Sequence, residues 1–258
     1  MIRLKNEKQI DGIRKSCKLL SAMYCELIPL VKPGVQTIEI DQWVQAWIKK
    51  AGGRPVFLGY KVDKVPYPAA ICISINEEVI HGIPSKRRIR EGDLVSLDCG
   101  IELDGYISDQ ALSIEAGKAS DAVKKLNKTT NEALYRGIAA AKANDRLLQI
   151  SRAVESYVKP FGYGIVKEFC GHGVGLALHE APHVPNTPQG ANPKINNGMV
   201  IAIEPMINMG TSDIDVLDDK WTVVTADSKV SAHWEHTIAI FNGKTEILTE
   251  PLESFVFK

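Results

Sequence analysis

Two carboxylates stand in an otherwise apolar, strand-like stretch, SLDCGIELDGYISDQAL at residues 96–112. The pair Asp104-Gly105 predicts a two-residue hairpin turn, because a type I′ turn needs positive φ at both central positions. Pairing outward from that turn places Asp98 opposite Ala111 and puts Asp109 on the same face. The Cα atoms of the two aspartates should then lie about 7–8 Å apart. Two anions held in this way repel each other, and burial makes the repulsion costly unless a cation compensates.

A second pair of carboxylates lies later in the chain. Glu204 interrupts the apolar run VIAIEPM, and Glu235 precedes the apolar stretch HTIAIF. The hairpin alone is equally consistent with two solvated surface aspartates, but four acidic groups in strand-like contexts favour one shared site. Four gathered carboxylates would need metal, and oxygen ligands shared between two cations are how two-metal hydrolases hold a bridging hydroxide.

The segment CGHGVGLALHE at 170–180 adds nitrogen donors to this set. It carries His172 and His179, but not in the HExxH arrangement of a zincin helix. The glycines that alternate around His172 are predicted to thin the backbone so that another group can approach closely. Histidine and carboxylate donors together suit Mn, Fe, Co or Zn better than Mg or Ca alone.

The elements that must position these groups follow from hydrophobic periodicity. Apolar residues at helical spacing predict four helices, and Thr37 is predicted as the N-cap of the second. Strand-like stretches follow each pair of helices. We expect helices at 6–30, 37–51, 120–143 and 147–158, and strands at 69–75, 93–101, 106–114, 198–207, 221–226 and 236–241.

The order of two helices followed by strands occurs twice, which indicates an internal repeat. Overlaying 89–98 on 195–204 places Asp98 on Glu204, so that each half would contribute a carboxylate from the end of a matching strand. No Ser-, Gly- or Pro-rich linker separates the halves. We therefore expect a single domain over 1–258, with related halves at about 1–118 and 119–258.

The composition limits the class of protein. The 258 residues are 45% hydrophobic and 24% charged, and 31 basic residues balance 31 acidic ones. This balance offers no basic field for nucleic acid, and the apolar runs are too short to span a bilayer. The N-terminus lacks the apolar region of a secretory signal, and five cysteines without a CxxC pair suit reduced thiols in a cytosol. We expect a cytoplasmic globular protein with no membrane partner and no specific nucleic-acid partner.

Taken together, these motifs resemble the type I methionine aminopeptidases of bacteria over nearly the whole chain. The resemblance is carried by CISINEEVIHGIP at 72–84, the hairpin with Asp98 and Asp109, CGHGVG with His179, IEPM at 203–206, WTVVTADS at 221–228 and EHT at 235–237. It implies an α/β (α+β) pita-bread fold, in which two pseudo-symmetric halves with antiparallel sheets are covered by helices. It also implies removal of the initiator methionine from nascent polypeptides with a small second residue, by a hydroxide bound to two metal ions.

The resemblance further implies a ligand set. Asp98, Asp109, His172, Glu204 and Glu235 match the residues that would hold two divalent ions, with Asp109 and Glu235 bridging them. The ions could be Co, Mn, Fe or Zn, since all accept these ligands.

Roles at the substrate follow from the same resemblance. Glu204 would also handle the proton of the attacking water, and His179 would hydrogen-bond the substrate and steady the tetrahedral species. His81 would contact the scissile amide and help the leaving amine depart. The residues that match the lining of the methionine pocket are Tyr67, Cys72 and Trp221.

The chain departs from the family pattern around this set. His233 stands where the family usually has Gln, Leu178 stands where bacterial relatives often carry an aromatic residue, and the loop 59–68 is longer than expected. We interpret His233 as a group that supports the site or lies on the surface. His236 is interpreted as a hydrogen-bonding support for the neighbouring glutamate, and His183 as a surface loop residue.

Two alternatives stay open beside the aminopeptidase. One is a pita-bread relative that cleaves Xaa-Pro bonds, although such relatives usually carry a separate N-terminal domain. The other is a lapsed member that serves as a peptide-binding or interaction module, although a lapsed member should lose metal ligands. For the aminopeptidase, the expected partners are the N-termini of nascent polypeptides; transient association with the ribosome is left open, and a monomer is expected.

Overall fold

Four α-helices form in the computed structural model, which describes residues 1–250, and each lies within a range predicted from the sequence. The helices are α1 (Glu7–Leu27), α2 (Thr37–Lys50), α3 (Asp121–Ala140) and α4 (Leu148–Val158), with 3₁₀ turns η1 (Ile28–Leu30) and η2 (Lys159–Phe161) after the first and last. None of the helices in this part of the chain is long and apolar enough to cross a membrane.

At the starts of α1 and α2, side chains accept hydrogen bonds from free backbone N–H groups. Asn6 and Gln9 form a capping box at α1, in which each side chain accepts from the backbone N–H of the other. The prediction that Thr37 caps α2 is wrong by one residue. Gln36 is the N-cap, and the side chain of Glu39 accepts from its N–H, while the Thr37 hydroxyl donates to the carbonyl of Ser85.

The strands follow the predicted order, with additional short strands between them. They are β1 (Arg54–Pro55), β2 (Lys61–Val62), β3 (Val65–Pro66), β4 (Cys72–Ile75), β5 (Glu78–Ile80), β6 (Leu94–Leu103), β7 (Tyr106–Glu115), β8 (Gly164–Ile165), β9 (Gly171–Gly173), β10 (Glu180–Val184), β11 (Met199–Ile203), β12 (Met206–Asn208), β13 (Ile214–Val216), β14 (Val223–Thr225), β15 (Ser231–His233), β16 (Glu235–Phe241) and β17 (Lys244–Ile247).

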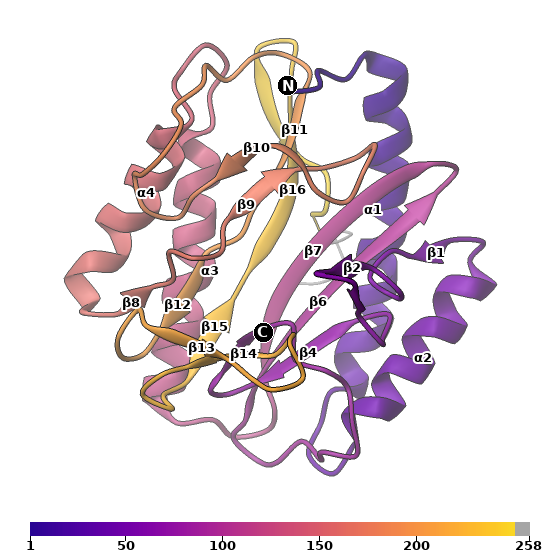
Figure 1. The fold of residues 1–258 in the computed structure, drawn as a ribbon, viewed down its shortest axis with the longest axis vertical. Coiled ribbons are helices and arrows are strands. Elements are labelled where there is room, and N and C mark those ends of the chain that lie inside the picture. The colour runs from indigo at the N-terminus through magenta and orange to yellow at the C-terminus, as the bar shows by residue number, and fades with distance from the viewer. Residues whose placement is uncertain (251–258) are drawn as a thin grey trace.

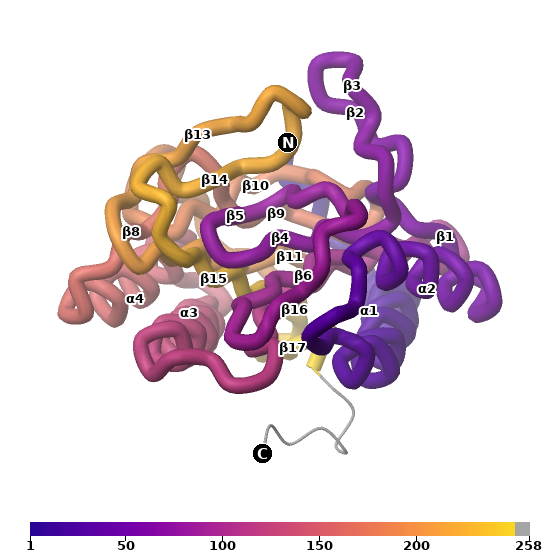
Figure 2. Tube along the Cα trace, turned by 90° about the horizontal axis from the view of Figure 1, so that it is seen from below, coloured from indigo at the N-terminus to yellow at the C-terminus, as the bar shows by residue number. Residues whose placement is uncertain are grey.

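A nine-stranded antiparallel sheet organises the molecule (Figure 1). Its order is β1-β6-β7-β16-β11-β9-β10, with β4 also paired to β6 and β17 to β16. Figure 2 shows the four helices on one side of this sheet, and the β2–β3 and β13–β14 hairpins on the opposite side. Because β7 pairs with β16, strands from both predicted halves form one sheet. The division into two related halves of one domain stays a prediction, and residues 251–258 of the second half lie outside the described residues.

The hairpin register predicted from the Asp104-Gly105 turn is confirmed. Leu103 pairs with Tyr106 and Asp98 pairs with Ala111 along β6 and β7. Asp98 lies in the middle of β6, however, so the expectation that each half presents a carboxylate from a strand end is wrong for this residue.

The strand predicted at 198–207 is interrupted at its carboxylate. β11 ends directly before Glu204, and the chain resumes as β12 in a separate sheet with the order β15-β12-β8. Pro205 has no N–H to donate to a strand ladder, which favours a break at this point. The break leaves Glu204 at the junction of two sheets.

The main hydrophobic core lies between the helices and the nine-stranded sheet. Leu20 of α1, Val44 of α2 and Leu134 of α3 pack in one cluster with Leu97 of β6 and Ile201 of β11. The outward helix faces can be polar, since each helix buries one apolar stripe in this way. The opposite side of the sheet can therefore carry the polar side chains of the candidate site.

Candidate metal centre and substrate cavity

All ten residues assigned to the site from the sequence line a single cavity of about 560 Å³. They are Tyr67, Cys72, His81, Asp98, Asp109, His172, His179, Glu204, Trp221 and Glu235. The structure thus brings together residues that are up to 168 positions apart, from Tyr67 to Glu235. Their individual roles stay predictions.

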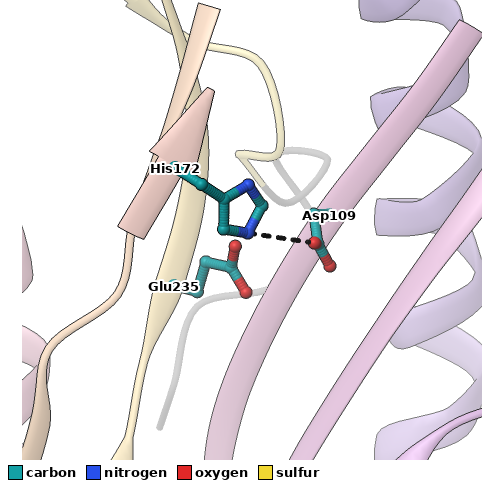
Figure 3. Close-up of side chains that lie close together, drawn as sticks. All are labelled: Asp109, His172 and Glu235. Atoms are coloured by element: carbon teal, nitrogen blue, oxygen red, sulfur yellow. Dashed lines mark ion pairs between the residues drawn. The ribbon is translucent and has the colours of Figure 1, made fainter. Parts of the chain in front are cut away.

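Three donors meet at the centre of the cavity. One donor atom each from Asp109, His172 and Glu235 lies within 4.8 Å of the others, and all three residues are buried. Figure 3 shows the three side chains pointing toward one another from β7, β9 and β16, with His172 Nε2 3.7 Å from Asp109 Oδ2. Atoms at these separations could share one metal ion.

Sheet register explains how the carboxylates converge. Ala111 of β7 pairs with Asp98 of β6 on one side and with Glu235 of β16 on the other. Directly paired residues share a face, so the small alanine separates two acids in one row across three strands. Asp109 lies two residues along β7 on the same face. Glu204 adds a fourth carboxylate, with Oε1 3.4 Å from His172 Nε2.

The His172 imidazole is oriented by its own backbone. Its Nδ1 lies 3.0 Å from the carbonyl oxygen of Gly173, which can only accept a hydrogen bond. Nδ1 must therefore carry the proton, and Nε2 presents its lone pair to Asp109 and Glu204. Burial lowers the pKa of His172 to about 3, so the ring is neutral and suited to metal ligation.

The glycines beside His172 allow a close approach, as predicted, and it is the backbone of neighbouring segments that approaches. A Cβ at Gly171 would clash with the carbonyl oxygen of Ala202, and one at Gly173 would clash with that of Ala181. Both contacts are with neighbouring backbone, so the absent side chains let the adjacent segments approach β9.

The electrostatics of the cavity call for a cation. Burial raises the pKa of Asp98 to about 7 and that of Glu204 to about 8. Burial and the neighbouring carboxylates raise the pKa of Asp109 and of Glu235 well above the usual range. No lysine or arginine of residues 1–250 lines the cavity. Four clustered acids, two buried and two partly buried, are strongly disfavoured without a lysine or arginine unless they are protonated or bind metal.

Unsatisfied oxygen atoms support the same conclusion. Within the described part of the chain, Asp98 Oδ1, Asp109 Oδ1 and Glu235 Oε1 are buried without a hydrogen-bond partner. Buried polar atoms normally find partners, and orphaned ones indicate a missing ion or water. Carboxylate oxygens and a neutral imidazole nitrogen are the donors that Mn, Fe, Co and Zn accept. The donor set therefore fits divalent metal.

One wall of the cavity is apolar. Tyr67, Cys72 and Trp221 belong to a hydrophobic cluster that also contains Phe57 and Leu178. The rings of Tyr67 and Trp221 meet edge to face, with centroids 5.1 Å apart. Such a wall suits a flexible, unbranched thioether side chain.

Two further histidines line the cavity, one beside the apolar wall and one beside the donor cluster. His81 directly follows β5 with a φ of 59°, and its ring lies 6.0 Å from that of Trp221. The rings of His179 and His172 are 4.3 Å apart. Burial lowers the pKa of both His81 and His179, so both rings are neutral at physiological pH.

Sequence reasoning missed Tyr60, which also lines the cavity. Its hydroxyl lies 2.7 Å from Nδ1 of His179. Tyr60 sits in the loop 59–68, whose unexpected length hid any correspondence with the family pattern.

One interpretation of another histidine is wrong in part, and a second is wrong. His183 is exposed, as expected, but it lies in β10 and not in a loop, where it pairs with His172 and lines the cavity. His236 does not support Glu235, because its ring nitrogens face Thr249 and Tyr135. Strand alternation in β16 turns His236 to the opposite face of the sheet.

A model of the metallopeptidase family M24 matches residues 11–242. The chain belongs to this family. The methionine aminopeptidase of Treponema pallidum is 51% identical over 255 residues, which cover 98% of both chains. The chain therefore falls among the methionine aminopeptidases of family M24.

Solved structures of methionine aminopeptidases agree with this assignment. The methionine aminopeptidase of Rickettsia prowazekii superposes with a TM-score of 0.93 at 32% identity, covering 97% of this chain and 100% of the other. That of Thermotoga maritima gives 0.92 at 36% identity, with the same coverage. The predicted pita-bread fold is confirmed, and membership of a metallopeptidase family confirms the use of divalent metal.

Proposed function

We propose that this M24 metallopeptidase removes the N-terminal methionine from nascent polypeptides whose second residue is small. The observation that carries the proposal is the meeting of a buried acidic and histidine cluster with an apolar wall in one cavity. The cluster supplies the place for the scissile amide, and the wall supplies the place for the methionine side chain. Family membership makes the reaction metal-dependent amide hydrolysis.

Five residues would hold two divalent ions: Asp98, Asp109, His172, Glu204 and Glu235. Asp109 and Glu235 would bridge the ions, which is consistent with their central position and their unsatisfied oxygens. Divalent ions at such a site supply Lewis-acid polarisation of the carbonyl and activation of water. The ions would be Co, Mn, Fe or Zn, which all accept these donors.

The remaining residues would bind and orient the substrate. The methionine side chain would lie against Tyr67, Cys72 and Trp221. With the Tyr60 hydroxyl donating to Nδ1 of His179, the proton of the neutral ring lies on Nε2, which can donate to the oxygen of the scissile amide.

Proton transfer would fall to two further side chains. Glu204 would take the proton of the attacking water, because its carboxylate borders the donor cluster. His81 would contact the scissile amide and help the amine depart.

We also propose a cytoplasmic monomer, since nascent chains are made in the cytoplasm and one chain contains all ten site residues. Because the proposed substrates are nascent chains, we also propose transient association with the ribosome. Size-exclusion chromatography and cosedimentation with ribosomes test these two points.

The two alternatives are not favoured. A lapsed binding module would not be expected to keep all five candidate ligands in one cavity. An Xaa-Pro peptidase is disfavoured by the high identity, over almost the full length of both chains, to a protein named methionine aminopeptidase.

Hydrolysis of matched tripeptides tests the proposal. Enzyme stripped with chelator and then restored separately with Co²⁺, Mn²⁺, Fe²⁺ or Zn²⁺ should cleave Met-Ala-Ser, and should leave Met-Lys-Ser and Leu-Ala-Ser largely intact. Equal cleavage of Leu-Ala-Ser would contradict methionine specificity. Folded protein that cleaves none of the peptides with any metal would overturn the proposed function.

A further inference from the structure

His233 is held rigidly beside the cavity without lining it. It ends β15 and pairs with Met206 of β12. Its backbone N–H donates to Oγ of Ser113 at 3.0 Å, and the Ser113 hydroxyl donates to its carbonyl at 2.9 Å. The residue is only 1% exposed, which excludes a surface role.

The ring of His233 points a polar atom at Glu204. Nε2 is buried without a hydrogen-bond partner in the described chain, and it lies 3.6 Å from Oε2 of Glu204. The other oxygen of the same carboxylate, Oε1, lies 3.4 Å from Nε2 of His172. The Glu204 carboxylate therefore stands between two imidazoles, with one oxygen toward each.

The two imidazoles differ in their relation to the donor cluster. His172 belongs to the group whose donor atoms lie within 4.8 Å of one another, whereas His233 does not. His172 already uses Nδ1–H on a carbonyl and offers a lone pair at Nε2. At His233 the free atom is Nε2 itself, next to a carboxylate oxygen that can only accept when ionised.

We propose that His233 is a positioning residue whose Nε2–H donates a hydrogen bond to Oε2 of Glu204 and so keeps Oε1 turned toward the donor cluster. The inference rests on the proposed function, since it concerns the metal affinity of that site. A distance of 3.6 Å is slightly beyond a hydrogen bond, so the two side chains must close by a few tenths of an ångström. Partners of this kind typically change metal affinity or activity by about 10- to 100-fold when removed.

Two amide substitutions provide a matched pair. In His233→Gln, the amide nitrogen reaches about the place of Nε2 and can still donate a hydrogen bond to Glu204. An amide is, however, a poor metal ligand. In His233→Asn, the amide nitrogen falls about where Nδ1 stood and cannot reach Glu204. His233→Leu removes the donor altogether and serves as a second loss variant should the asparagine protein not fold.

Titration of chelator-stripped protein with Co²⁺, followed by calorimetry and by the visible absorption of the bound ion, gives a readout independent of turnover. We expect His233→Gln to keep the wild-type spectrum and an affinity within about threefold of wild type. His233→Asn and His233→Leu should lose about 10- to 100-fold in affinity and change the spectrum, with unchanged circular dichroism.

Two results would overturn the inference. A glutamine variant as impaired as the asparagine variant would mean that the imidazole is itself a ligand. Wild-type affinity and spectrum in all three variants would mean that His233 does not position Glu204. Wild-type protein that binds Co²⁺ but leaves Met-Ala-Ser intact would overturn the proposed substrate, and the Co²⁺ spectra would still decide the role of His233.

Discussion

The floor and the rim of the cavity are built in different ways. The floor consists of Asp98, Asp109, His172, Glu204 and Glu235, which lie in paired strands or, for Glu204, directly after one. The rim consists of Tyr60 and His179, which lie in loops before β2 and β10. Strands of one sheet hold the floor through backbone ladders, whereas the rim depends on a few side-chain contacts.

The rim segment that carries His179 is held by the residue that follows it. Oε1 of Glu180 accepts hydrogen bonds from the backbone N–H groups of Leu176 and Ala177, at 2.7 and 3.0 Å. Its Oε2 accepts from Nζ of the buried Lys5 at 3.0 Å. We therefore expect substitutions in the floor to abolish turnover, and substitutions in the rim to lower turnover only moderately.

The largest effect is expected in the floor, from Glu204→Gln. The amide cannot accept a proton as a base and is a weaker ligand, so turnover should fall by at least about 10²- to 10⁴-fold. Metal affinity should fall as well, without loss of the fold. Peptide hydrolysis, Co²⁺ titration and circular dichroism measure the three quantities.

Glu168→Gln is the matched control, because Glu168 lines the same cavity but is exposed and lies outside the donor cluster. It should keep near wild-type turnover. An active Glu204→Gln enzyme would contradict the role given to Glu204.

Removing metal from the floor should make stability depend on pH. Carboxyls in an unfolded chain have pKa values near 4, whereas those of Asp98 and Glu204 in the metal-free fold are about 7 and about 8. The fold thus holds protons that the unfolded chain has released. This stability is fully present below about pH 4 and is lost as the pH rises through about 7 and 8, by about 1.4 kcal/mol per pH unit for each such proton.

Thermal unfolding of chelator-stripped protein at pH 6, 7 and 8 measures this dependence. The melting temperature should fall with rising pH, and the increase on adding Mn²⁺ should be larger at pH 8 than at pH 6. An increase that is the same at each pH would show that the carboxyls are not protonated in the metal-free fold.

The same contrast explains what the sequence could predict. Asp98 and Asp109 of the floor could be predicted because the Asp104-Gly105 turn sets a register. That register alone places both side chains on one face of the hairpin. Glu204 and Glu235 could be predicted because a charged residue in or next to an apolar strand pattern is unusual. Their convergence with the hairpin, by contrast, depends on β7 pairing with β16, a long-range contact that no local pattern encodes.

Of the two rim residues, Tyr60 could not be predicted, for a physical reason. Tyr60 reaches His179 through the conformation of a loop, and loops have no hydrophobic period that relates sequence to direction. The face of His236 was in principle predictable, since strand alternation opposes it to Glu235. Reasoning from adjacency in sequence led to the wrong interpretation there.

A smaller effect is expected at the rim, from Tyr60→Phe. Losing the hydroxyl removes the hydrogen bond to Nδ1 of His179, worth about 1 kcal/mol, or about fivefold in kcat. Co²⁺ affinity and spectrum should not change, because Tyr60 does not touch the floor. Tyr163→Phe, which alters a ring stacked on Phe161 away from the cavity, should leave kcat unchanged. A loss of metal in the Tyr60 variant would remove the distinction between rim and floor.

The smallest effect on the site is expected from His236→Asn, although His236 is adjacent to Glu235. The asparagine amide can keep the contact of Nδ1 with the Thr249 hydroxyl, while the 3.3 Å contact of Nε2 with Tyr135 is lost. The free energy of unfolding should fall by about 1 kcal/mol, and Co²⁺ affinity and kcat should stay within about twofold of wild type. A tenfold loss of Co²⁺ affinity would restore the interpretation of His236 as a support for Glu235. For His233→Asn, by contrast, a loss of about 10- to 100-fold in Co²⁺ affinity is expected. Comparing the two variants shows whether a residue affects metal affinity because its side chain lies on the same face as the ligands or because it is near a ligand in the sequence.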